Sequence, residues 1–344
     1  MKAIVYEKYG LPEVLQLKEV EKPSPKDDEV LIKVKAASVN SSDWEFLTGK
    51  PVYVRMWGLL KPKYKILGSD IAGRVESVGR KVKQFQPGDE VLGDIFAHGF
   101  GGFAEYVCAP VKALMLKPAS ITFEEAAAVP QAAVVALQAL RDKGLDQEGQ
   151  DSHTGKPTSR SGKKKVLING AGGGQGTYSV QLAKLFGAEV TGVDSTRKLE
   201  MMRAIGADHV IDYTKEDFNK NGQQYDLILD FVARRSIFDT KRSLSSNGKY
   251  VLIGGSMTTI FQTAFIGPLI SITSSKKMGI LGHRQNKKDL AYMIELHEAG
   301  KVVPVIDRTY PLRDVSEALR YLGEGQAKGK VVITTEKNNN PDNS

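Results

Sequence analysis

Residues 166–177 combine a short apolar run with a glycine-rich stretch, Val-Leu-Ile-Asn-Gly-Ala-Gly-Gly-Gly-Gln-Gly-Thr. The apolar run is typical of a buried parallel strand. The glycines would allow a tight turn and let the bare backbone approach a pyrophosphate. Residues 177–186 then favour a helix whose first amides would face those phosphates. The loop expected to hold a dinucleotide consists of Ala171, Gly172, Gly173, Gly174, Gln175 and Gly176.

A carboxylate follows at a distance suited to holding a ribose. Asp194 ends the next apolar run, about 18 residues after Gly176, which is close to the usual spacing for a ribose-binding acid. The glycine pattern is irregular, because Ala171 stands in the first glycine position. Two alternatives therefore stay open for the loop alone: a turn that binds no nucleotide, and the nucleotide loop of a methyltransferase.

The elements that must position these residues alternate between strands and helices from residue 165 onward, which predicts a doubly wound parallel sheet. The strands are expected at 166–168, 189–193, 209–211, 227–230 and 250–253, and the helices between them at 181–186, 197–205 and 237–244. Earlier residues favour short strands at 3–6, 14–20, 29–37, 71–78, 90–95 and 104–110. Helices are expected at 123–140, 289–299 and 315–322, and further strands at 302–306 and 331–334. Residues 146–164 are predicted to form an exposed loop and residues 337–344 a disordered tail.

Composition excludes several classes of protein. The 344-residue chain is 41% hydrophobic and 26% charged, which is typical of a globular protein with two domains. No apolar run approaches the roughly 20 residues that span a bilayer, and the N-terminus lacks the apolar segment of a signal peptide. The single cysteine, Cys108, excludes an intrachain disulfide, so a cytoplasmic location is expected. The net charge of +8 comes from dispersed basic residues without a nucleic-acid-binding motif, so no nucleic-acid partner is expected.

Further motifs lie along nearly the whole chain. They are Ala-Ser-Val-Asn-Ser-Ser-Asp-Trp at 37–44, Leu-Gly-Ser-Asp-Ile-Ala-Gly at 67–73, Pro-Gly-Asp-Glu-Val at 87–91, Gly-Gly-Phe-Ala-Glu-Tyr at 101–106, Ala-Ala-Ala-Val-Pro at 126–130, Gly-Ala-Asp-His-Val-Ile-Asp-Tyr at 206–213 and Gly-Lys-Val-Val-Ile at 329–333. The chain resembles the zinc-independent medium-chain dehydrogenases/reductases, in the quinone oxidoreductase and alkenal/enone reductase branch.

The resemblance implies a two-domain α/β protein. A GroES-like catalytic domain would be built from residues 1–126 and 305–336, and a Rossmann nucleotide-binding domain from residues 127–304. It also implies a nicotinamide cofactor that delivers hydride, an active site in the cleft between the domains, and a homodimer formed through an edge strand of the cofactor domain. It disfavours the methyltransferase alternative.

The ligands of a catalytic zinc are missing. Zinc-dependent relatives use two cysteines and a histidine, and here the corresponding positions are Asn40, Ser69 and Gln131. One cysteine cannot build a structural zinc lobe, and the five histidines are scattered, so no metal is expected. Without a Lewis acid the favoured substrates are quinones and α,β-unsaturated carbonyls, which already contain an electron sink.

The catalytic candidates are three. Asn40 would donate to a substrate carbonyl or contact the nicotinamide, and its alternative is a turn residue after the strand at 29–37. Ser69 and Asp70 are expected to line the cleft, with a structural turn as the alternative. Asp43 would orient Asn40 or cap the following helix. Cofactor-binding positions implied by the resemblance are Tyr213 beside the adenine, Gly254, Gly255 and Ser256 at the nicotinamide amide, and Asn286 and Lys330 near the cleft.

The choice between NADH and NADPH depends on Asp194. A carboxylate there accepts hydrogen bonds from the ribose hydroxyls and repels a 2′-phosphate, which favours NADH. Ser195, Arg197 and Lys198 follow, and NADPH-using relatives bind the 2′-phosphate with a similar sequence. If these cations are exposed at the helix start, their attraction for a 2′-phosphate should be weaker than the repulsion between that phosphate and the Asp194 carboxylate. NADH is therefore favoured, and NADPH stays an option.

The function expected from the sequence is zinc-independent, NAD(P)H-dependent hydride transfer to quinones or α,β-unsaturated carbonyls. Two alternatives stay open: a zinc-independent alcohol or aldehyde dehydrogenase, and a non-catalytic dinucleotide-binding protein.

Overall fold

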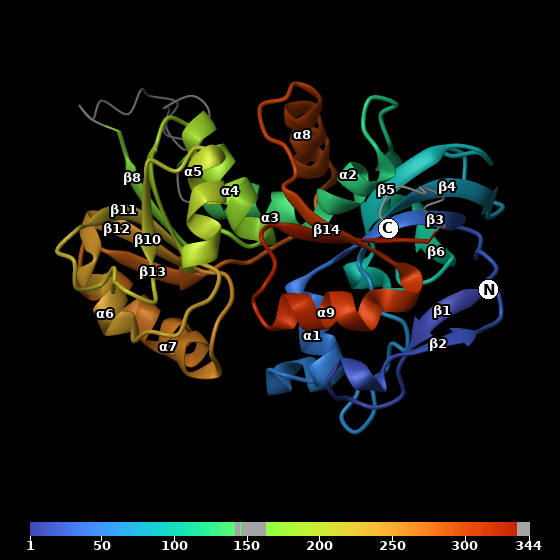
Figure 1. Cartoon of the computed structure of the whole chain (residues 1–344), viewed down its shortest axis with the longest axis horizontal. Coiled ribbons are helices and arrows are strands. Elements are labelled where there is room, and N and C mark those ends of the chain that lie inside the picture. Colours follow the sequence, from blue (N-terminus) through green and yellow to red (C-terminus); the bar gives the residue numbers. More distant parts are fainter. Residues whose placement is uncertain (142–144, 146–162, 336–344) are drawn as a thin grey trace. The chain divides into compact units, whose positions relative to one another are not determined.

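The computed structural model describes residues 1–141, 145 and 163–335. The tail expected at 337–344, and all but the end of the loop expected at 146–164, lie outside these residues. The chain divides into two compact units (Figure 1). Unit 1 comprises Met1–Ala132, Gln285–Glu298 and the segment from Ile306, and unit 2 comprises Ala133–Arg284 and Ala299–Val305.

Unit 1 is built on a largely antiparallel seven-stranded sheet. Its order is β14 (Ile306–Pro311), β15 (Lys330–Thr334), β3 (Glu29–Val39), β4 (Asp70–Val78), β5 (Glu90–Asp94) and β7 (Leu114–Leu116), with β6 (Tyr106–Pro110) also paired to β3. A separate hairpin-like pair joins β1 (Lys2–Val5) to β2 (Gln16–Glu19), and the helices of the unit are α1 (Ser41–Thr48), α2 (Phe123–Ala128), α8 (Lys287–Glu298) and α9 (Val315–Gly323).

The long strand β3 holds unit 1 together. Its N-terminal half pairs with β6 and β4, and its C-terminal half pairs with β15 and β4, so strands from both ends of the chain meet on it. Most of its residues are buried, including Val30, Ile32 and Val34, whereas Lys33 is exposed. The apolar residues therefore dominate the strand and are interrupted by two lysines, Lys33 and Lys35. The three alanines at the end of α2 are also buried and allow close approach to the sheet.

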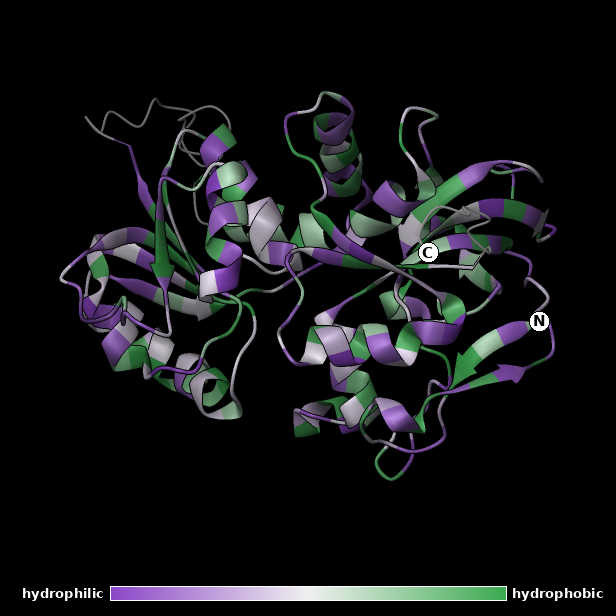
Figure 2. Ribbon diagram, in the orientation of Figure 1, coloured by the Kyte–Doolittle hydropathy of each residue, from purple (hydrophilic) through white to green (hydrophobic). Residues whose placement is uncertain are grey.

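Unit 2 is a doubly wound α/β fold, as the sequence predicts. Its six-stranded parallel sheet has the order β10-β9-β8-β11-β12-β13. Numbered from β8, this order is 3-2-1-4-5-6, the arrangement of dinucleotide-binding sheets. Its strands are β8 (Lys165–Asn169), β9 (Glu189–Asp194), β10 (His209–Asp212), β11 (Tyr225–Asp230), β12 (Leu244–Leu252) and β13 (Lys277–Ile280). Its helices are most of α3 (Pro130–Arg141), α4 (Gly174–Leu185), α5 (Leu199–Ala204), α6 (Ile237–Arg242) and α7 (Met257–Thr273). Hydrophobic and hydrophilic residues are mixed along α4, α5 and α6 (Figure 2).

The turn from β8 to α4 requires glycine at Gly176. A Cβ there would lie 2.1 Å from the Gly170 carbonyl oxygen and 2.7 Å from the Ala171 backbone, far inside van der Waals contact. Gly170 itself has a φ of 88°, in the left-handed region that favours glycine. The glycine stretch thus serves two purposes, since it turns the chain and packs the start of α4 directly onto the end of β8.

The structure differs from the sequence-based expectations at four places. The helix expected at 123–140 is two helices, because α3 (Pro130–Arg141) begins at Pro130, a residue suited to the first turn of a helix. The strand expected at 302–306 is wrong, since the strand is β14 at Ile306–Pro311. Helix α7 and strands β7 and β13 were not expected at all. In α7 the periodicity is lost because Pro268 lies inside the helix and its exposed face is as apolar as its buried face.

The fourth difference concerns α8, which was expected in the nucleotide-binding domain but groups with unit 1. Three hydrogen bonds explain this placement. Gln285 donates to the Asp94 carbonyl at 3.2 Å, Lys287 to the Val111 carbonyl at 2.8 Å, and Ser120 to the Glu298 carboxylate at 2.6 Å. None of the helices in the described part of the chain is long and apolar enough to cross a membrane.

Candidate active site and cofactor loop

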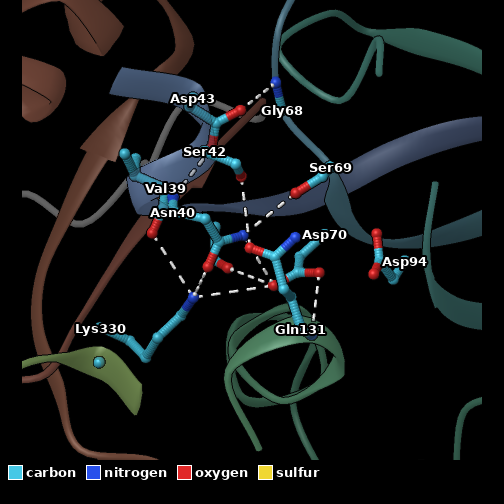
Figure 3. A network of polar contacts seen from close by, with 12 residues as sticks. Val39, Asn40, Ser42, Asp43, Gly68, Ser69, Asp70, Asp94, Gln131 and Lys330 are labelled. Carbon is cyan, nitrogen blue, oxygen red and sulfur yellow. Dashed lines mark hydrogen bonds and ion pairs between the residues drawn. The ribbon is translucent and has the colours of Figure 1, made fainter. Parts of the chain in front are cut away.

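A cluster of buried polar side chains lies inside unit 1 (Figure 3). Strands β3, β4, β5 and β15, the start of α1 and the start of α3 each contribute to it. We call it the polar cluster, and its members are Ser38, Asn40, Asp43, Ser69, Asp70, Asp94, Gln131 and Lys330. The three positions that correspond to zinc ligands in relatives, Asn40, Ser69 and Gln131, are all among them.

Asn40 is held in one orientation by Lys330. The Lys330 Nζ donates to Asn40 Oδ1 at 2.5 Å, and since an ammonium group can only donate, the amide oxygen must face it. The Asn40 Nδ2 then donates to Ser69 Oγ at 3.2 Å and to Asp70 Oδ2 at 2.9 Å (Figure 3). Both N–H bonds of the amide are used within the cluster. Donation from Asn40 to a substrate carbonyl stays a prediction, and it would require one of these bonds to open.

Asp70 and Lys330 form a fully buried pair. Their exposed side-chain fractions are 0% and 2%, and Lys330 Nζ lies 3.7 Å from Asp70 Oδ2. Asp70 also accepts hydrogen bonds from Ser38 Oγ at 3.2 Å and from the main-chain N–H of Gln131 at 3.1 Å. Burial raises the pKa of Asp70 and lowers that of Lys330, while their mutual attraction opposes both shifts. A charge buried without its partner costs several kcal/mol, so the two side chains depend on each other.

Asp43 links the cluster to the start of α1. Its carboxylate accepts from the Asn40 main-chain N–H at 2.8 Å and from the Gly68 N–H at 2.9 Å. The first bond places Asn40 at the beginning of the helix, so Asp43 both caps α1 and fixes the backbone of Asn40. Burial raises the pKa of Asp43 to about 7, against the lowering effect of these two hydrogen bonds.

Gln131 supplies a donor that the cluster does not use. Its Oε1 accepts from Ser42 Oγ at 3.3 Å, and in the described part of the chain its Nε2 donates to no protein acceptor. The sequence marked Gln131 only as a residue in place of a cysteine. An amide N–H in a largely buried setting is a suitable donor to a developing oxyanion.

The cofactor loop of unit 2 has the geometry expected for a pyrophosphate. The amides of Gly174, Gln175 and Gly176 open α4 and have no acceptor within the helix. Asp194 braces the loop from the end of β9, since its Oδ2 accepts from the Gly172 N–H at 3.0 Å and its Oδ1 from the Ser195 N–H at 2.8 Å. A dinucleotide fits this loop, because free amides at a helix start are the groups that bind its phosphates.

Lys198 is buried, which corrects the expectation that it is an exposed cation. Its Nζ lies 3.3 Å from Asp194 Oδ1, and the exposed side-chain fractions of the two residues are 7% and 10%. The four-residue spacing places both groups on one face of the turn that leads into α5. Its stem covers Gly172, where an added Cβ would lie 2.6 Å from Lys198 Cδ.

The other predicted positions fall into two places. Tyr213 is exposed at the end of β10, and its N–H donates to the Asp194 carbonyl at 3.2 Å. Gly254, Gly255 and Ser256 follow β12, and Ser256 caps α7 by accepting from the Thr259 N–H at 3.2 Å. Asn286 and Lys330 belong to unit 1. Asn286 accepts from the Lys288 N–H at 2.9 Å at the start of α8, and Lys330 lies in the polar cluster.

Comparisons with known proteins agree with this architecture. Residues 26–119 match the alcohol dehydrogenase GroES-like domain family, and residues 205–333 match the zinc-binding dehydrogenase family. The chain is 36% identical to 2-methylene-furan-3-one reductase of Solanum lycopersicum and 34% identical to the chloroplastic NADPH-dependent alkenal/one oxidoreductase of Arabidopsis thaliana, over 97% of this chain and 79% of each relative. The quinone oxidoreductase structure from Coxiella burnetii superposes with a TM-score of 0.84 at 28% identity, covering 98% of this chain and 99% of that one.

The chain belongs to the medium-chain dehydrogenase/reductase superfamily, in its quinone oxidoreductase and alkenal/one reductase branch. The predicted resemblance and the predicted combination of a GroES-like domain with a Rossmann domain are confirmed. Membership of this superfamily also removes the methyltransferase alternative for the glycine loop. The cytoplasmic location expected from the sequence stays a prediction.

The polar cluster of this dehydrogenase/reductase does not suit the zinc ion that the family description implies. Asn40, Ser69 and Gln131 offer no thiolate or imidazole, and a buried ammonium contacts the Asn40 oxygen that a metal would need. Across residues 1–141, 145 and 163–335, no group of three or more His, Cys, Asp or Glu side chains could hold a metal ion. We derive no step through zinc.

The mutual dependence of Lys330 and Asp70 leads to a prediction about stability. Lys330→Met should lower the free energy of unfolding by about 3–5 kcal/mol, because it leaves a carboxylate buried without its counter-ion. Lys330→Met combined with Asp70→Asn should be more stable than Lys330→Met alone, as measured by urea unfolding.

Arg74→Gln provides the control, since Arg74 forms an exposed ion pair with Glu90 at 2.8 Å on the neighbouring strands. Its loss should cost less than about 1 kcal/mol. Strictly additive losses in the Lys330 and Asp70 double variant would show that the pair is not coupled.

Proposed function

We propose that this protein catalyses zinc-independent, NAD(P)H-dependent reduction of quinones or α,β-unsaturated carbonyls. The observation that carries the proposal is the ammonium group of Lys330, which is buried against Asn40 at the positions where relatives bind a metal. The names of the relatives support the same substrate classes, since they include an alkenal/one oxidoreductase and a quinone oxidoreductase.

The donor set of the polar cluster suits substrates that are already electron-poor. An unactivated ketone or alcohol needs a strong Lewis acid, and neutral amide donors are weaker than a metal. A quinone or an enone instead delocalises the incoming charge into a phenolate or enolate, which hydrogen-bond donors can stabilise. Gln131 Nε2 is the donor left available for this purpose, and Ser42 holds its amide from the other side.

The residues of unit 2 would hold the nucleotide. The first amides of α4 bind the pyrophosphate, Asp194 lies at the ribose, and Tyr213 lies beside it at the next strand end. The bound nicotinamide would supply the hydride. The protein supplies orientation, and the carboxylate of Asp194 contributes indirectly by fixing the Gly172 amide within the loop.

The proposal is tested by mixing the purified protein with NADH or NADPH and a panel of quinones and enals. Consumption of the reduced nicotinamide, followed by absorbance, should depend on the acceptor and should survive treatment with a chelator. Chelator-insensitive oxidation of ethanol without activity on the panel would favour the alcohol dehydrogenase alternative. Tight cofactor binding without turnover of any acceptor would favour the binding-protein alternative.

We infer that the protein uses NADPH as well as NADH. The expectation of NADH preference assumed an uncompensated carboxylate at Asp194, but Lys198 lies 3.3 Å from it and is buried with it. A carboxylate paired with an ammonium group presents little net charge to a 2′-phosphate. The buried Lys198 should therefore offset the repulsion between Asp194 and a 2′-phosphate better than an exposed cation would, because water screens a buried charge far less.

Replacing Lys198 tests this inference. Lys198→Met should weaken NADPH binding by at least about tenfold and NADH binding much less, because only NADPH meets the uncompensated carboxylate with its phosphate. Asp194→Asn should shift preference toward NADPH. Both are measured by titration while following nicotinamide fluorescence.

Arg203→Gln is the matched control, since Arg203 is an exposed cation on the following helix α5 and its loss should change either affinity less than about fivefold. Equal weakening of NADH and NADPH by Lys198→Met would mean that the lysine only braces the glycine loop.

We also propose that unit 2 forms a homodimer through α7 and β13. Strand β13 is the last in its sheet, and in the described residues it pairs only with β12. Helix α7 packs beside it, contains no charged residue, and exposes Phe261, Phe265, Leu269 and Ile272 on one face. Exposed apolar faces of this kind mark interfaces, and an edge strand can meet its own copy across a two-fold axis.

Phe265→Glu combined with Ile272→Glu should convert the dimer to a monomer, measured by sedimentation equilibrium at micromolar concentration. The buried carboxylates would not be tolerated at a two-fold contact. Leu60→Glu is the control, because Leu60 is equally exposed but lies in unit 1. A monomeric wild-type protein, or an unchanged dimer in the double variant, would contradict this interface.

A further inference from the structure

Three carboxyl groups share the polar cluster with a single ammonium group. Asp43, Asp70 and Asp94 are all buried, and Lys330 is the cation among them. If all three carboxyl groups were ionised, the cluster would carry a net charge of two negative units inside unit 1. Burial of uncompensated charge costs several kcal/mol per ion, so at least one of these groups must hold a proton at neutral pH.

Hydrogen bonds decide which carboxyl group that is. The Asp70 carboxylate is contacted by four donors, which all favour its ionised form: Lys330 Nζ, Asn40 Nδ2, Ser38 Oγ and the main-chain N–H of Gln131. Asp43 receives two main-chain N–H groups, at 2.8 and 2.9 Å, one on each oxygen. Each of these donors favours the ionised form, and Asp70 has four of them and Asp43 two.

Asp94 is the least stabilised as an anion. It ends β5 and is paired with Asp70 on β4, so the two side chains are neighbours on the same face of the sheet. Its Oδ1 accepts from the Phe96 N–H at 2.8 Å, which among the described residues is the one direct hydrogen bond to its carboxyl group. The Gln285 side-chain amide donates to the Asp94 main-chain carbonyl at 3.2 Å, and from there it also lowers the pKa of the carboxyl group, but less than burial and Asp70 raise it. It is also the most exposed of the three, at 9%, so it alone has some access to solvent.

The charges around Asp94 also favour its protonated form. Asp70 and Asp43 raise its affinity for a proton, and the more distant Lys330 is already engaged by Asp70 and Asn40. The neighbouring strand β7 contributes apolar residues, and α2 faces the sheet with alanines. His98 lies four residues further along and has its own pKa lowered by burial and by Lys112. Burial and the charge of Asp70 raise the pKa of Asp94 to about 7.

We propose that Asp94 stores the proton that completes reduction of an α,β-unsaturated carbonyl. This inference rests on the proposed function. Hydride from the reduced nicotinamide forms a C–H bond at the β-carbon, and the electron pair of the double bond moves to the enolate. The O–H bond of Asp94 then breaks as a C–H bond forms at the α-carbon, directly or through one water. The Asp94 carboxylate recovers its proton from solvent.

A consequence separates the two substrate classes. Reduction of an enone is complete only when a carbon atom has been protonated, and carbon protonation needs a positioned acid. Reduction of a quinone leaves a hydroquinone anion, whose oxygen atoms take a proton from water without help. Loss of the Asp94 proton should therefore impair enone reduction and largely spare quinone reduction.

Asp94→Asn tests this, because an asparagine keeps an oxygen for the Phe96 N–H and cannot release a proton. We expect kcat for an enal to fall about 100-fold, in the range of general-acid effects, and kcat for a quinone to fall less than about threefold. In the wild-type protein, kcat for the enal should decrease as pH rises through about 7, where Asp94 loses its proton, and the variant should lose this inflection. Equal losses for both substrates would overturn the proposal, while intact quinone reduction shows that the proposed function stands.

Two controls complete the test. Glu90→Gln changes an acid on the same strand that is ion-paired with Arg74, and it should leave both activities and the pH profile unchanged. Glu45→Gln removes a rival acid, whose pKa burial raises to about 7 beside Tyr53. Loss of the inflection in Glu45→Gln instead of Asp94→Asn would overturn the proposal.

An infrared measurement needs no turnover. In the wild-type protein a carbonyl-stretching band of a protonated carboxyl group should disappear as pH is raised through about 7. Because burial also raises the pKa of Asp43 and Glu45 to about 7, the band is assigned by comparison with Asp94→Asn, which should lack it. Absence of any such titrating band in the wild-type protein would also overturn the proposal.

Discussion

The buried contact of Lys330 with Asn40 and Asp70 determines most of what the polar cluster can do. An ammonium group that is removed from water must keep its counter-ion, so Asp70 stays ionised and β15 stays joined to β3 and β4. Because the ammonium group only donates, it also sets the direction of the Asn40 amide. The same positive charge opposes a metal ion at these positions. One side chain therefore accounts for the charge balance, the orientation of the donors and the kind of chemistry that the cluster permits.

Local patterns in the sequence were enough to predict the doubly wound sheet and the cofactor loop. Val166, Leu167 and Ile168 are all fully buried in β8, and the glycines that follow make the turn that their spacing predicts. The strand β3 was also found, because apolar residues dominate it even though Lys33 and Lys35 interrupt the run. Helix α7 could not be found in the same way, since apolar residues lie on its exposed face, threonines lie on its buried face, and Pro268 lies inside it. Periodicity is informative only when one face of a helix differs from the other.

The polar cluster could be predicted only in part. Family motifs pointed to Asn40, Ser69 and Asp70, and the structure brings these three into direct contact. Nothing local in the sequence connects them with Asp94, or with Lys330 some 290 residues away from Asn40. The pairing arises from strand order, which places β15 and β4 on either side of β3 and β5 beside β4. Charge balance is a property of that arrangement, so it could not be read from the separate motifs.

The two units use the same buried pair, an aspartate with a lysine, at very different sequence separations. In unit 2 the partners are Asp194 and Lys198, four residues apart, and in unit 1 they are Asp70 and Lys330. In each pair the ammonium group offsets the negative charge of a carboxylate that is buried beside it. The four-residue spacing of Asp194 and Lys198 suggests that they pair, but only the structure shows that both side chains are buried together, so that the charge of one offsets the charge of the other. An aspartate at the end of a Rossmann strand therefore predicts cofactor choice only when the charge of its nearest buried neighbour is known.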